Sequence, residues 1–114
     1  MSVVPITILW DAKTAKIVDV SPDPVRLTWI DNDIAEFILK CKGDDKAKIV
    51  DIWFEGKDPK GPFSLLEATP HTYDKAWTGA QMAHVTKEYK YSLKVQGTNG
   101  EDVLDPRMQT DQGP

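Results

Sequence analysis

Residues 89–96 read Tyr-Lys-Tyr-Ser-Leu-Lys-Val-Gln, an alternation of apolar and polar side chains without a break. Successive side chains of a β-strand point to opposite faces of its sheet, so this stretch predicts a strand with one buried face and one solvated face. The glycines and asparagine of residues 97–100 are typical of a hairpin turn, and Val103 and Leu104 restart a strand. An antiparallel sheet is therefore expected. The side chains expected to cover its core are Tyr89, Tyr91, Leu93 and Val95.

Six further segments have the composition of short β-strands. Each is rich in β-branched or aromatic residues, and turn signals separate them at intervals of about ten residues. They span residues 3–10, 16–20, 25–29, 37–41, 49–54 and 63–68. With the hairpin they predict an all-β fold, an antiparallel Greek-key β-sandwich of seven or eight strands with an immunoglobulin-like architecture.

Prolines and tryptophans add detail to this prediction. Pro5 lacks a backbone donor, so the first strand should lie at a sheet edge or carry a bulge. The two prolines of residues 21–24 cannot continue a ladder and mark a corner where the chain changes sheets. The strand parity places Trp10, Trp29 and Trp53 in the core.

Residues 69–86 are the one segment whose structure the pattern does not predict. No single period fits them, and residues 76–85 suit a helical turn as well as a weak strand. Residues 1–108 are expected to form a single β-sandwich domain. Residues 109–114 have nothing to bury and are expected to form a flexible C-terminal tail.

Composition restricts the function classes. The 114 residues suit one domain, and the net charge is −4, with lysines and arginines dispersed rather than clustered as in a nucleic-acid binder. The single cysteine, Cys41, excludes an internal disulfide and suits a reducing compartment. The N-terminal apolar run ends before Asp11, too early for a signal peptide or a membrane span. We expect a cytoplasmic protein that binds neither nucleic acid nor a membrane.

The ligand types of a copper site are present in the chain. They are Cys41, His71, Met82, His84 and Met108. In the cupredoxin family, whose sandwich this chain resembles, the cysteine, one histidine and the methionine share a loop before the final strand. Cys41 lies in the first half of the chain instead, where a small buried side chain is expected. We therefore expect no metal and no cofactor.

Two other polar sets have simpler explanations. Asp31, Asp33 and Glu36 offer carboxylates for calcium without EF-hand spacing, and aspartates commonly begin turns. A hydrolytic triad drawn from Ser64, His71 and Asp74 lacks a nucleophile elbow around the serine. Neither set predicts catalysis.

The aromatic residues of the ambiguous segment are the better candidates for binding. His71, Tyr73 and Trp77 lie in a mostly polar stretch, and exposed rings on a loop of a rigid scaffold supply contact area at low entropy cost. We predict that these three residues bind a ligand. The alternative is that Trp77 folds back as a lid over the open end of the core.

The strand order and the turns resemble the DP-EP family, a group of small bacterial β-sandwich proteins of unknown function. The resemblance rests on the 21–24 corner, on the ending 89–95, and on the steps Asp23-Pro24 and Asp105-Pro106, although the chain has no Glu-Pro step. It implies an immunoglobulin-like or cupredoxin-like sandwich over most of the chain and supplies no functional residues.

The leading hypothesis is a non-enzymatic binding or assembly module. Its partner would be a protein or a small carbohydrate-like ligand, and an exposed edge strand could pair two copies into a homodimer. The alternative is a small metal-dependent protein or hydrolase that uses His71, His84 and nearby acids.

Overall fold

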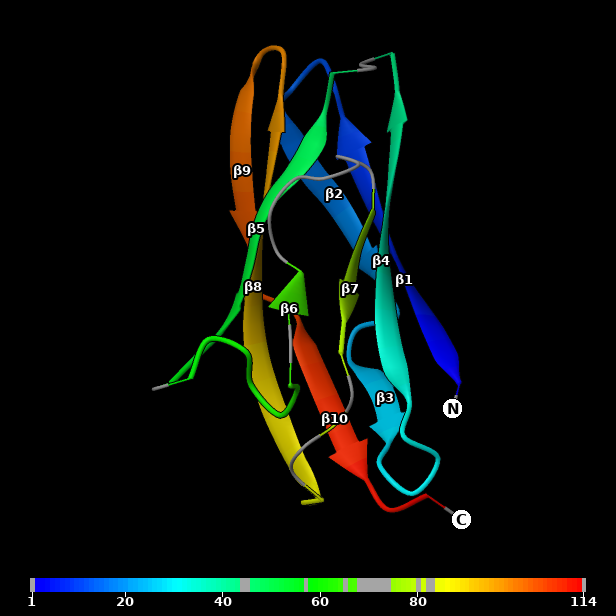
Figure 1. Ribbon diagram of the computed structural model, residues 1–114. Coiled ribbons are helices and arrows are strands. Elements are labelled where there is room, and N and C mark those ends of the chain that lie inside the picture. Colours follow the sequence, from blue (N-terminus) through cyan, green and yellow to red (C-terminus); the bar gives the residue numbers. More distant parts are fainter. Residues whose placement is uncertain are drawn as a thin grey trace.

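The computed structural model describes residues 2–43, 46–56, 58–64, 66–67, 75–79, 81 and 84–113. Over these ranges the protein is all-β, and two mixed sheets pack against each other as two layers (Figure 1). Within the same ranges no helix is long and apolar enough to cross a bilayer. The strands are β1 (Val3–Asp11), β2 (Lys16–Ser21), β3 (Val25–Thr28), β4 (Ile34–Lys42), β5 (Lys48–Phe54), β6 (Leu66–Glu67), β7 (Lys75–Thr78), β8 (Lys87–Gly97), β9 (Gly100–Leu104) and β10 (Arg107–Asp111).

The order of strands confirms an all-β fold of two packed sheets and corrects its details. One sheet has the order β2-β1-β4-β7-β6, and the other has the order β3-β10-β8-β5, with β9 also paired to β8. The prediction of purely antiparallel sheets is wrong, because β1 pairs with β4 and β10 pairs with β3 in parallel. Turn signals report only on strands that follow each other in sequence, and these partners do not.

The strand that decided the fold prediction is β8. Its side chains Tyr91, Leu93 and Val95 are fully buried, as the alternation predicts, and Tyr89 packs against the edge of the core. β8 turns back into β9 through a hairpin closed by the Gly97–Gly100 pair. The Tyr91 hydroxyl has no hydrogen-bond partner among the described residues, and its burial raises the pKa of the phenol.

The corner at residues 21–24 carries the chain from β2 in one sheet to β3 in the other, as predicted. Pro5 lies in β1 between two other strands, but β2 pairs only with Thr7–Asp11 of β1. The Pro5 half of β1 therefore has β4 as its one described neighbour, and a register shift follows between Leu9 and Trp10. The prediction of an edge strand is therefore wrong for β1, and the alternative prediction of an irregularity agrees with this register shift.

The C-terminal tail is shorter than predicted. Residues 109–111 complete β10, and Thr110 is fully buried, where its hydroxyl donates to the Val85 carbonyl oxygen at 2.7 Å. The prediction of a flexible tail from residue 109 is therefore wrong for these three residues. Polar residues such as threonine can occupy a core position when their hydroxyl finds an acceptor, which apolar patterning does not reveal.

The two sheets are joined at the edge formed by β2 and β9. The Ile17 amide of β2 donates to Oδ2 of Asp102 in β9 at 3.0 Å, and Nζ of Lys16 lies 3.8 Å from the other oxygen of that carboxylate. The Asn99 side chain of the β8–β9 turn donates to the Ala12 carbonyl at 3.0 Å. A side chain thus satisfies an edge amide of β2 that would otherwise be open to another strand.

Candidate functional site

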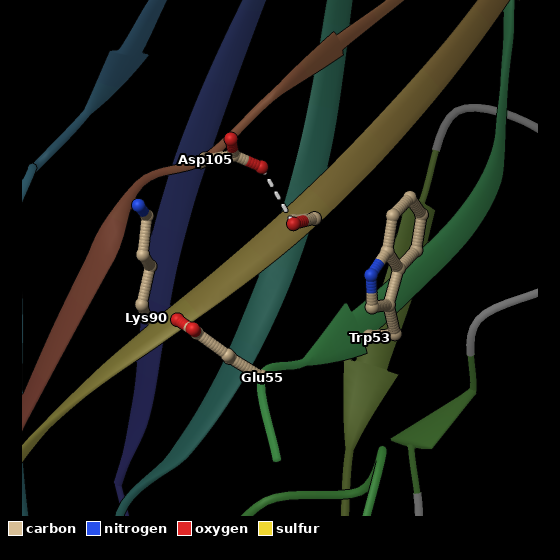
Figure 2. A pocket seen from close by; sticks show the side chains of 5 residues that line it. Trp53, Glu55, Lys90 and Asp105 are labelled. Atoms are coloured by element: carbon tan, nitrogen blue, oxygen red, sulfur yellow. Dashed lines mark hydrogen bonds between the residues drawn. The ribbon is translucent and has the colours of Figure 1, made fainter.

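A shallow hollow lies on the outer face of the second sheet, where β5, β8 and the β9–β10 connection meet (Figure 2). Its volume is about 220 Å³. This is below the ~300–1,000 Å³ of sites for drug-sized ligands, so it suits a single ring or side chain. The residues that line it are Trp53, Glu55, Lys90, Ser92 and Asp105.

The position of Trp53 corrects the sequence analysis, which placed this side chain in the core. Ile52 and Phe54 are buried on the inner face, so Trp53 between them projects outward and is only half-buried. A register shift between Ile49 and Asp51 leaves Val50 as an extra residue. That bulge reverses which side chains of the strand face outward after Val50. In the sequence it appears as a loose alternation of apolar and polar residues over 49–54.

Cross-strand register assembles the hollow. Trp53 of β5 pairs directly with Ser92 of β8. On the other side of β8, Asp105 directly follows the end of β9. Its carboxylate accepts a hydrogen bond from the Ser92 hydroxyl at 2.6 Å. The Glu55 amide donates to the Lys90 carbonyl at 3.0 Å, which holds the end of β5 beside β8. Strand pairing thus brings together residues from three separate parts of the chain.

The polar groups of the hollow are largely uncommitted. Among the side chains drawn in Figure 2, the bond from the Ser92 hydroxyl to Asp105 is the one hydrogen bond. Within the described part of the chain, the Trp53 indole N–H, the Glu55 carboxylate and the Lys90 ammonium group have no hydrogen-bond or ion-pair partner. The site therefore offers a flat aromatic ring, two donors and a free acceptor to solvent.

Trp77 lies on the other sheet, so this predicted binding residue is not part of the hollow. Its strand β7 pairs with β4, which settles the choice between helix and strand for residues 75–78. Trp77 is half-buried, and its indole N–H donates to Oε2 of the Glu36 carboxylate opposite it at 2.8 Å. The other two predicted binding residues, His71 and Tyr73, lie outside the described residues, so the role of the three residues stays a prediction.

The candidate metal ligands that the structure describes are Cys41, His84 and Met108, and of the triad it describes Ser64 alone. The His84 ring is stacked on Trp29, with centroids 5.0 Å apart and planes at 4°. Cys41 is partly buried and packs against the core. Within the described ranges no group of three or more His, Cys, Asp or Glu residues is placed to hold a metal ion. His71, Asp74 and Met82 lie outside those ranges.

The carboxylates considered for calcium have structural partners. Asp33 is buried, and its Oδ2 accepts hydrogen bonds from the amide and the hydroxyl of Thr28, both at 2.9 Å. The nearby Gln81 side chain donates to the carbonyls of Thr28 and Asp33 at 3.1 and 2.8 Å. These bonds fix the turn between β3 and β4, as expected of aspartates that begin turns.

No protein-family model matches this chain, and no curated protein sequence matches it.

Proposed function

We propose that this protein is a non-enzymatic binding module whose hollow at Trp53 holds a neutral, hydroxyl-bearing ligand such as a sugar ring. The observation that carries the proposal is the half-exposed indole beside unpaired donors and an unpaired acceptor. An indole supplies a large apolar face together with a polar N–H, and a sugar ring presents C–H groups on its faces and hydroxyls at its rim. A few well-placed polar groups then fix the orientation of the ligand.

The charge of the hollow favours a neutral ligand over an ionic one. Glu55 and Asp105 are offset in part by Lys90, which leaves one net negative charge that disfavours an anion, while Lys90 disfavours a cation. One Asp105 oxygen is occupied by Ser92, and hydroxyl groups can donate to the remaining carboxylate oxygens and accept from the ammonium group. Hydrogen bonds to charged groups contribute more than neutral ones, which suits a shallow site that buries little apolar area.

The same contacts support binding rather than catalysis. The Ser92 hydroxyl gives its hydrogen bond to a carboxylate, and among the described residues that line the hollow there is no imidazole to act as its general base. Glu55 and Asp105 are both exposed to solvent rather than enclosed with a substrate.

Matched tryptophan variants test the proposal. We expect isothermal titration calorimetry with glucose, galactose, mannose and N-acetylglucosamine to detect at least one saturable ligand. Trp53→Ala should raise the Kd of that ligand about 30-fold, which corresponds to the ~2 kcal/mol that a binding hot spot contributes. Trp77→Ala removes an equivalent indole from the other sheet and should leave the affinity unchanged.

The reverse pattern, loss of affinity in the Trp77 variant alone, would move binding to the residues predicted from the sequence. Failure of all four sugars to bind the native protein would contradict the proposed ligand class.

The proposal also includes the sandwich type, the family, the location and the oligomeric state. The chain passes repeatedly from one sheet to the other, which supports a Greek-key, immunoglobulin-like sandwich. Membership of the DP-EP family, a cytoplasmic location, and the absence of metal, nucleic-acid and membrane partners stay predictions. A homodimer through an edge strand also stays a prediction, and β5 is a better candidate for that edge than β2, because Asp102 occupies the Ile17 amide of β2.

A further inference from the structure

A second hollow adjoins the first one at the end of β5. Its volume is about 280 Å³, and it shares two residues, Glu55 and Lys90, with the hollow at Trp53. The remaining residues that line it are Gly56, Lys87, Glu88 and Tyr89. Because two residues belong to both, the hollows adjoin as one groove that passes round the end of β5, with Trp53 on the outer face of the sheet and Tyr89 on its inner side at the margin of the core.

The end of β5 creates this second hollow. The last pair between β5 and β8 is Phe54 with Tyr91, so within the described ranges residues 87–89 of β8 pair with β10 alone. Tyr89 is consequently left half-exposed at the margin of the core, with its ring edge-on to Phe54 at 6.0 Å. Partial burial raises the pKa of Tyr89, so its hydroxyl stays protonated and can donate at neutral pH.

Charge is balanced among the residues that line the second hollow. They include Glu55 and Glu88 together with Lys87 and Lys90, and Nζ of Lys87 lies 5.0 Å from the centroid of the Tyr89 ring. A strongly anionic or cationic polymer would meet a like charge in either hollow. An uncharged chain that carries many hydroxyl groups would find donors and acceptors throughout the groove.

We propose that the groove binds a neutral oligosaccharide chain, with one sugar unit at Trp53 and the next at Tyr89, and with Glu55 and Lys90 between them. This inference rests on the proposed function, because it assigns a length to the ligand of the same site. Linking two units makes the second contact intramolecular, so affinity should rise as soon as the chain spans both hollows. Units beyond those that the groove can hold should add little.

Chain-length titrations test the inference. We expect calorimetry with glucose and with the β-1,4- and α-1,4-linked glucose oligomers of two to five units to show at least a tenfold fall in Kd between one unit and three in one series, followed by a plateau. The double variant Lys87→Ala/Tyr89→Phe removes both polar groups and keeps the ring that packs on Phe54. It should lose the gain with length and retain the affinity for the single sugar.

Gln96→Ala, an exposed change at the far end of β8, is the matched control and should behave as the native protein. Equal affinities for one unit and three, or a gain with length that survives in the double variant, would overturn the two-unit groove while the single-sugar site stands. If neither glucose nor any oligomer binds, the proposed function itself fails for these sugars. Trp53→Ala should raise the Kd of every oligomer in a series that binds.

Discussion

Replacement of Phe54 by alanine is expected to lower the free energy of unfolding by about 3–5 kcal/mol. The Phe54 side chain is 2% exposed, and its ring lies 5.6–6.0 Å from three other aromatic rings. Those rings are Phe63, Tyr89 and Tyr91. Its removal leaves a cavity where the core narrows between β5 and the loop that follows, and the loss should appear as a lower midpoint in urea denaturation.

Its neighbour Trp53 provides the matched control, because it is the larger side chain on the same strand. Trp53 points away from the core, so Trp53→Ala should lower the free energy of unfolding by only about 1 kcal/mol. Similar losses of unfolding free energy in the two variants would mean that Trp53 is a structural residue. That result would contradict a binding site in the hollow. The inner face of β5 is thus expected to stabilise the fold, and its outer face to bind the ligand.

Among the substitutions proposed here, Gly61→Ala is expected to lower the free energy of unfolding most after Phe54→Ala. Gly61 has a φ of +59°, and a Cβ atom there would lie 2.5 Å from Cγ of Phe54. The ring is enclosed by other aromatic side chains and has little room to retreat, so overpacking should cost about 1–3 kcal/mol beyond the backbone strain. Thermal unfolding followed by near-ultraviolet circular dichroism would report both stability and aromatic packing.

Backbone strain can be separated from the clash with Phe54 by a second glycine. Gly43 has a φ of +84°, further from the left-handed region that other residues tolerate, and a Cβ atom added there would meet nothing within 4 Å beyond its chain neighbours. Gly43→Ala should therefore suffer at least as much strain and no clash. A Gly61 variant as stable as the Gly43 variant would contradict the close packing of the loop on Phe54.

Local alternation was sufficient to predict the fold class. The pattern of residues 89–96 identified the buried face of β8, and the prolines of residues 21–24 identified the change of sheet. The parallel pairs of β1 with β4 and of β10 with β3 were missed, because no turn joins the partners and nothing local encodes their register. The final strand was missed because Thr110 is a polar residue buried by a hydrogen bond.

The candidate site was harder to predict than the fold. Residues 49–54 alternate too loosely to show which way Trp53 points, and one extra residue reverses which side chains face outward. Lys90 and Ser92 were correctly placed on the solvated face of β8. Their meeting with Trp53 and Asp105 depends on pairings between strands, which appear only once the two sheets are assembled.

The four indole N–H groups of the protein have different surroundings, which allows one direct measurement. The nitrogens of Trp10 and Trp29 are buried without a partner among the described residues, and that of Trp77 donates to Glu36. The nitrogen of Trp53 has no partner in the described part of the chain, at the edge of the hollow. A ligand in that hollow should therefore perturb one indole resonance far more than the others.

Titration of ¹⁵N-labelled protein with the β-1,4- and α-1,4-linked glucose trimers, followed through these four resonances, is the most direct test. We predict a saturable shift of the Trp53 resonance with at least one trimer, together with shifts of the Lys90 and Ser92 amides, while the Trp10, Trp29 and Trp77 resonances stay in place. A Trp53 resonance unmoved by both trimers, or a saturable shift confined to Trp77, would contradict a sugar site at Trp53.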